Sequence, residues 1–168
     1  VFVCNSIGLG TANDKSDVDL FIITDSKRIW LVRFFANLTM LVFGMRRRGN
    51  KIAGKICLSF FVDEKNLNMA PWRVCEDDIH LAYWIYQMMP IYDPDNFYEK
   101  LLVSNSWLKK YLPNIKNISG HTAKVEDSDL GLKWKNLWEK FWTGRYGNLI
   151  ENQAREIHRV RSSPSPHA

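Results

Sequence analysis

Asp17 and Asp19 stand one residue apart at the start of an apolar run, residues 20–23. Because side chains alternate between the two faces of a strand, both carboxylates are expected to point the same way. Like charges held together raise each other's pKa, and a divalent cation between them removes this cost. Carboxylate oxygens suit Mg²⁺ or Mn²⁺, and Mg²⁺ usually completes its shell with water and substrate phosphates. The spacing therefore predicts a site for a metal and a triphosphate; the alternative is turn formation and capping alone.

The loop before the aspartates has features of an anion-binding turn. Ser6, Gly8 and Gly10 allow backbone N–H groups to approach an anion closely, and Ser6 adds a hydroxyl group. The loop lacks the Gly-Lys-Ser/Thr of a Walker A motif and the third glycine of a dinucleotide fingerprint. Lys15 and Arg28 lie near the aspartates in the sequence and carry charge that would neutralise phosphate. All five residues are therefore candidate nucleotide ligands.

A small residue and serine, a glycine-containing loop and then Ser-Asp-apolar-Asp-apolar resemble the signature of nucleotidyltransferases of the DNA polymerase beta superfamily. Three longer segments are similar to a group of uncharacterised prokaryotic nucleotidyltransferase-domain proteins, so the resemblance covers most of the chain. They are DVDLFIITDSKRIWLVRFF, GMRRRGNKIAGKICLSFFVDEKNLNM and YEKLLVSNSWLKKYLPN. The resemblance implies transfer of a nucleoside monophosphate from an NTP, with ATP as the expected nucleotide, and release of pyrophosphate.

The resemblance also implies roles for individual residues. Asp17 and Asp19 match the catalytic metal-binding pair, and Ser6 matches the serine of Gly-Ser that touches the terminal phosphates. Two metal ions would activate the acceptor hydroxyl and steady the leaving pyrophosphate. Asn5 stands where the family has glycine. Asparagine tolerates a positive φ better than most residues, so the turn is expected to survive.

The family's third carboxylate belongs to a later strand, here ICLSFFVDE. Alternation places Cys57, Ser59, Phe61 and Asp63 on one face, and Asp63 is the only acid in phase. Asp63 is therefore the candidate for the third metal ligand. It lies four residues beyond Ser59, or about 13 Å along a strand. If the catalytic level is that of Ser59, the third acid is absent.

Hydrophobic patterns predict the elements that position these residues. We expect an α+β fold, with a small mixed-sheet nucleotidyltransferase core over residues 1–70 and an all-helical C-terminal region over residues 71–168, frayed from about residue 161. Asp25-Ser26 is the expected cap of the first long helix. The expected strands span residues 1–4, 17–24 and 56–62, and the expected helices span residues 27–43, 77–89, 97–112, 130–142 and 147–160.

Composition limits the class of protein. The formal net charge is +5 over 168 residues, a mild bias towards anionic partners. The three cysteines are far apart and form no Cys-x-x-Cys, which favours reduced thiols in a cytoplasmic protein. The most apolar segment, residues 29–45, contains Arg33 and Asn37, so a buried helix is expected rather than a membrane span. Because the chain opens without Met, we expect the natural chain to begin upstream.

Three functions stay open at this point. The first is metal-dependent nucleotidyl transfer to a small molecule, RNA or protein. The second is a nucleotide-binding module with a decayed site, which Asn5 and the missing third acid favour. The third is an interaction protein whose Trp-rich helix, residues 130–142, contacts a partner. The basic cluster at residues 46–48 would steer a triphosphate or RNA, or else be a solvated helix end.

Overall fold

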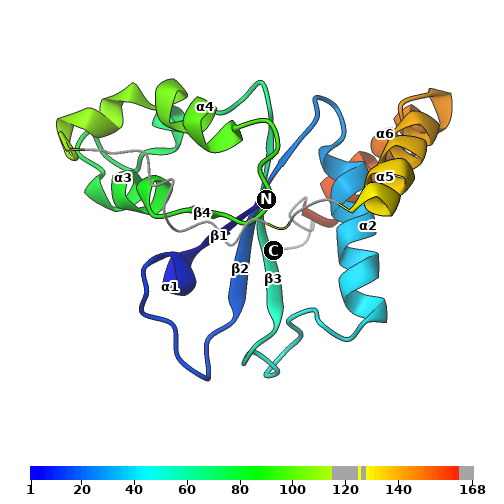
Figure 1. Ribbon diagram of the computed structural model, residues 1–168, viewed down its shortest axis with the longest axis horizontal. Helices are drawn as coiled ribbons and strands as arrows, with labels where there is room; N and C mark the ends of the chain where they lie inside the picture. The colour runs from blue at the N-terminus through cyan, green and yellow to red at the C-terminus, as the bar shows by residue number, and fades with distance from the viewer. Residues whose placement is uncertain (115–124, 126–127, 163–168) are drawn as a thin grey trace, which may run out of the picture.

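The computed structural model describes residues 1–114, 125 and 128–162 of the chain. Four strands form a mixed sheet in the order β3-β2-β1-β4, with helices on both of its faces (Figure 1). The strand β1 runs antiparallel to β2 and β4, whereas β2 and β3 are parallel. The expected α+β class is thereby confirmed. The strands are β1 (Phe2–Cys4), β2 (Val18–Thr24), β3 (Ile56–Asp63) and β4 (Met89–Pro90).

Within the described residues, six α-helices and two short 3₁₀ helices surround this sheet. They are α1 (Asn5–Gly8), α2 (Ile29–Val42), η1 (Ala70–Trp72), α3 (Ile79–Tyr86), α4 (Phe97–Ser104), η2 (Ser106–Lys110), α5 (Asp129–Trp142) and α6 (Arg145–Ser162). Helix α2 connects β2 to β3, because parallel strands need a long crossover connection. Among the helices of the described residues, none has the length and apolar character needed to span a bilayer.

The apolar run of β2 is explained by cover on both of its faces. Phe21 packs with Phe2 in a core cluster that residues of α3 and α4 complete. Leu20 and Ile22 point to the opposite face and pack with Val3. A strand buried on both sides has no polar face, so the alternation typical of a half-exposed strand is missing from this run.

Residues beyond 70 complete the sheet as well as the core. The strand β4 pairs with β1 through Pro90 and Met89, so the second expected helix, residues 77–89, ends at Tyr86 instead of continuing to Met89. Asp78 caps α3 by accepting the Leu81 N–H at 2.9 Å. One strand of the sheet therefore belongs to the part of the chain that was expected to be all helical.

The helix expected over residues 97–112 is interrupted at Asn105. This side chain is fully buried, and its Oδ1 accepts the Met69 N–H at 2.7 Å while its Nδ2 donates to the Leu67 carbonyl at 2.7 Å. These bonds attach the chain before η1 to the end of α4. A helical Asn105 would have to give up this geometry, so α4 ends at Ser104 and η2 follows.

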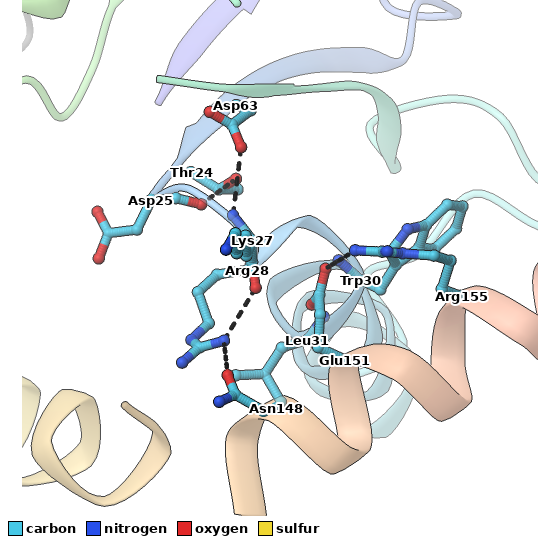
Figure 2. Close-up of polar contacts among 10 residues, drawn as sticks. All are labelled: Thr24, Asp25, Lys27, Arg28, Trp30, Leu31, Asp63, Asn148, Glu151 and Arg155. Carbon is cyan, nitrogen blue, oxygen red and sulfur yellow. Dashed lines mark hydrogen bonds and ion pairs between the residues drawn. The ribbon is translucent and has the colours of Figure 1, made fainter. Parts of the chain in front are cut away.

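The expected cap of α2 by Asp25 or Ser26 is wrong. Helix α2 begins at Ile29, and the carboxylate of Glu151 on α6 accepts the N–H groups of Trp30 and Leu31 at 3.2 and 2.7 Å (Figure 2). The first N–H groups of a helix lack partners within the helix, and a carboxylate also favours the positive end of the helix dipole. The cap is therefore a tertiary contact.

Candidate functional site

The candidate site lies at the end of the sheet where β1 ends and β2 and β3 begin. Cys4, Asp19 and Cys57 are neighbours across the three strands, since Asp19 pairs in register with both cysteines. Asp17 directly precedes β2. In Figure 1 this is the lower end of the sheet, beside α1. The topology therefore brings the turn after β1 to the two aspartates, as expected.

Asp19 is held by neutral donors on both of its oxygens. It is 9% exposed, and its Oδ1 accepts the Ser59 hydroxyl at 2.6 Å while its Oδ2 accepts the Asn5 Nδ2 at 2.8 Å. Burial raises the pKa of Asp19, but hydrogen bonds from Ser59, Asn5 and Cys57 and the charge of Arg47 outweigh it, and the pKa falls below its usual range. The carboxylate is thus ionised and fixed in orientation.

Asp17 has a charged partner instead. The Arg47 Nη1 lies 2.6 Å from the Asp17 Oδ2, and the side chains are 43% and 14% exposed, respectively. Arg47 belongs to the loop between α2 and β3, and the hydrogen bond to Asp17 raises the pKa of its guanidinium. One residue of the basic cluster at residues 46–48 therefore contacts the site directly. The sequence alone had left open whether this cluster steers a triphosphate or RNA or is a solvated helix end.

Asp17, Asp19 and Cys57 form the candidate metal-ligand set. One ligand atom from each lies within 4.8 Å of the others. Two carboxylates fit Mg²⁺ or Mn²⁺, whereas a thiolate is a softer ligand of the kind that binds Zn²⁺. Alternation had placed Cys57 on the correct face, but the search for a third acid passed over it.

Asn5 connects the aspartates to α3. Its φ is 55°, the left-handed conformation expected where it replaces glycine. Its Oδ1 accepts the Trp84 Nε1 at 2.7 Å, and its Nδ2 is bound to Asp19. Asn5 thus fixes both the turn after β1 and one oxygen of Asp19. The contact with Trp84 spans 79 residues of sequence and has no local signal.

The glycine loop divides into parts with different requirements. Ser6 follows Asn5 in the first turn of α1, where backbone N–H groups have no acceptor within the helix. Gly8 is required by packing, because a Cβ there would lie 2.6 Å from the Gln87 carbonyl oxygen. Gly10 has a φ of 68°, which other residues rarely adopt. Of these three residues, only Ser6 directly follows Asn5 in the chain.

Asp63 was expected to be the third metal ligand. This expectation is wrong, because Asp63 does not lie beside Asp17 and Asp19. It pairs with Thr24, five residues along β2 from Asp19, which is about 16 Å. Its carboxylate instead accepts the N–H group of Lys27 at 3.2 Å (Figure 2). It also accepts the N–H group of Lys65 at 2.8 Å. The register shift at Ser59 reverses the expected alternation, so Phe61 packs with Leu20 and Ile22, and Asp63 lies on the face opposite to Asp19.

Arg28 lies near Thr24 and Asp63, at the end of the sheet opposite to the candidate site (Figure 2). Its guanidinium donates to the Asn148 Oδ1 at 2.8 Å and to the Thr143 carbonyl oxygen at 3.2 Å. It therefore joins α2 to the α5–α6 turn and is not placed to bind phosphate beside Asp17. Lys15 is exposed in the loop before β2, and its backbone N–H donates to the Asn13 Oδ1 at 2.9 Å.

A cavity of about 690 Å³ adjoins Asn5 on the side of α3. Its wall includes the aromatic side chains of Trp72, Tyr83 and Trp84. Trp84 hydrogen-bonds Asn5, and Asn5 in turn hydrogen-bonds Asp19, so Asn5 links the cavity wall to the aspartates. Aromatic faces of this kind stack with planar rings such as nucleobases.

Comparison of the chain with protein-family models, with curated proteins and with solved structures gives no significant match. Function is therefore inferred from the geometry of the site.

Proposed function

We propose that the chain is a metal-dependent nucleotidyltransferase, which moves a nucleoside monophosphate from an NTP to an acceptor and releases pyrophosphate. The observation that supports this most is the grouping of Asp17 and Asp19 beside the Asn5–Ser6 turn at one end of the sheet. ATP is the expected nucleotide. The acceptor is a small molecule, RNA or protein.

Each residue has a task in this proposal. Asp19 supplies an ionised carboxylate that Ser59 and Asn5 hold in place, and Asp17 supplies a second one that is more accessible. The Ser6 hydroxyl and the first N–H groups of α1 bind the phosphates. A bound Mg²⁺ or Mn²⁺ ion would lower the pKa of the acceptor hydroxyl and neutralise charge on the leaving pyrophosphate.

A second candidate function is nucleotide binding without turnover. The specific observation in its favour is that Cys57 and Ser59 stand beside Asp19, where the resemblance requires a third carboxylate. Two carboxylates and a thiol can hold a metal ion, yet the acceptor hydroxyl would lack one of its activating ligands. This candidate predicts NTP binding with no release of pyrophosphate.

The deciding experiment measures pyrophosphate release from each NTP in turn, with Mg²⁺ or Mn²⁺ and cell extract as the acceptor pool. Asp17→Asn and Asp19→Asn are expected to lower the rate by roughly a hundredfold or more, because each removes charge that holds the metal. Asp14→Asn, the same change in the preceding loop, is the matched control. Release that persists in both site variants would refute the proposal, and binding without release would favour the second candidate.

A further inference from the structure

A guanidinium group lies among the ligand atoms of the candidate metal site. Arg47 pairs with Asp17 at 2.6 Å and also interacts with the thiol of Cys57. These are two of the three groups whose ligand atoms lie within 4.8 Å of one another. The positive charge of Arg47 therefore stands where the charge of a divalent cation would be.

The backbone of Arg47 is attached to the sheet, whereas its side chain is open to solvent. The Arg47 N–H donates to the Ile56 carbonyl oxygen at 2.9 Å, and the Ile56 N–H donates to the Met45 carbonyl oxygen at 2.8 Å. These bonds hold the loop next to the first residue of β3. The side chain is 43% exposed. The guanidinium can leave Asp17 by rotation about its own bonds while the loop stays in place.

The two aspartates differ in what a metal ion must displace. Asp19 is surrounded by the neutral donors Ser59 and Asn5, which do not repel a cation. Asp17 carries Arg47, and a divalent cation on Asp17 would place two positive charges in contact. Like charges at that distance are strongly unfavourable when partly shielded from water. One of the two cations has to move, and Arg47 is the mobile one.

We propose that Arg47 is an exchangeable cation, which pairs with Asp17 until a metal–nucleotide binds and then moves to the nucleotide phosphates. This inference rests on the proposed function, since it assigns the phosphates as the second partner. Arginine presents a planar fork of N–H donors that matches phosphate oxygens. A triphosphate beside Asp17 would offer such oxygens at the point where the metal ion displaces the guanidinium.

The first test is calorimetric titration with Mn²⁺ alone, without nucleotide. Arg47→Gln removes the competing cation and is expected to bind Mn²⁺ about fivefold more tightly than the unchanged protein. Arg48→Gln is the matched control, because it removes the same charge from the next residue and is expected to leave Mn²⁺ affinity unchanged. Equal or weaker Mn²⁺ binding by Arg47→Gln would overturn the exchange.

The second test uses an ATP analogue with a non-hydrolysable α–β bridge at saturating Mn²⁺. Arg47→Gln is expected to bind the analogue about tenfold more weakly, and Arg47→Lys is expected to fall between the two, since lysine keeps the charge without the fork. Unchanged analogue affinity in Arg47→Gln would overturn the assignment to phosphate. Absence of Mn²⁺ binding in every protein would overturn both the exchange and the metal site of the proposed function. A failure confined to the Arg47 variants would leave the proposed function standing.

Discussion

Ser59 shows how one neutral side chain can govern the charge of the site. It is the extra residue where the register between β2 and β3 shifts, and its hydroxyl donates to the Asp19 Oδ1 at 2.6 Å. A bulge of this kind re-aims a side chain, so Ser59 approaches Asp19, which already pairs in register with Cys57. The hydrogen bond lowers the pKa of Asp19 and thereby opposes the effect of burial.

The pH dependence of stability follows from this shift. The folded pKa of Asp19 lies below its ordinary value of 3.8, so the unfolded state binds the proton more readily, and stability falls as pH drops from the ordinary value through the folded pKa. Ser59→Ala should raise the folded pKa and flatten this decline, with a loss of about 2 kcal/mol in the free energy of unfolding at neutral pH. Urea unfolding between pH 2 and 7, with carboxyl NMR titration of Asp19, measures both effects.

The control for Ser59→Ala is Ser26→Ala, which makes the same substitution at the opposite end of the sheet. It should leave the acid limb of the stability curve unchanged. An unaltered Asp19 titration in Ser59→Ala would contradict the role given to this hydroxyl.

At the scale of elements, α2 depends on α6 for its N-terminal cap. Glu151 is 2% exposed, and both of its oxygens accept N–H groups from the first turn of α2. Arg155 lies 3.8 Å from the same carboxylate. Because α2 connects the two parallel strands that carry Asp19 and Cys57, this cap supports the crossover behind the site. The last helix of the described chain thus contributes to the order of the first half.

Glu151→Ala is expected to lower the free energy of unfolding by about 2 kcal/mol, because two helix N–H groups lose their acceptor in a buried place. Glu156→Ala is the control on the same helix, where the side chain is 62% exposed and lies 3.9 Å from Arg159. An exposed pair of this kind contributes less than about 1 kcal/mol. Urea unfolding of both variants makes the comparison, and equal losses would contradict the capping role.

At the scale of the whole molecule, the candidate site is assembled from distant segments. The turn after β1 supplies Asn5, the start of β2 supplies the aspartates, and the segment from η1 to α3 supplies the aromatic wall of the adjoining cavity. In Figure 1 the helices α3 and α4 lie on one side of the sheet and α2, α5 and α6 on the other. The cavity belongs to the first of these sides, so the nucleobase is expected there.

Trp72→Ala tests this expectation. Trp72 is 52% exposed, so its loss should leave stability nearly unchanged while the affinity for an NTP analogue falls by roughly tenfold through lost stacking. Trp134→Ala removes a 67% exposed tryptophan from α5, away from the cavity, and should not affect nucleotide affinity. Calorimetric titration of the analogue against the two variants decides the matter, and equal affinities would place the base elsewhere.

The sequence by itself determined the local order of the molecule. Periodicity predicted β1, β2, β3 and α2 within about two residues of their ends, because burial imposes a period that can be seen in the chain. Strand alternation also predicted that Asp17 and Asp19 share a face, and the tolerance of asparagine for a positive φ predicted that the turn at Asn5 survives without the glycine that the resemblance implies. Each of these depends on neighbours in the chain, and the physical cause is present in the residues themselves.

Only the tertiary structure decided which distant groups meet at the site. Arg47 reaches Asp17 across 30 residues, and Ser59 reaches Asp19 across 40. Strand alternation assigns a face only while the ladder is regular, so Asp63 was expected on the face of Cys57 and Ser59, and the register shift at Ser59 instead pairs it with Thr24. The cap of α2 by Glu151 is missing from local patterns for the same reason. Register and helix packing arise from the whole core, whose energy is shared among many contacts rather than recorded in any one segment.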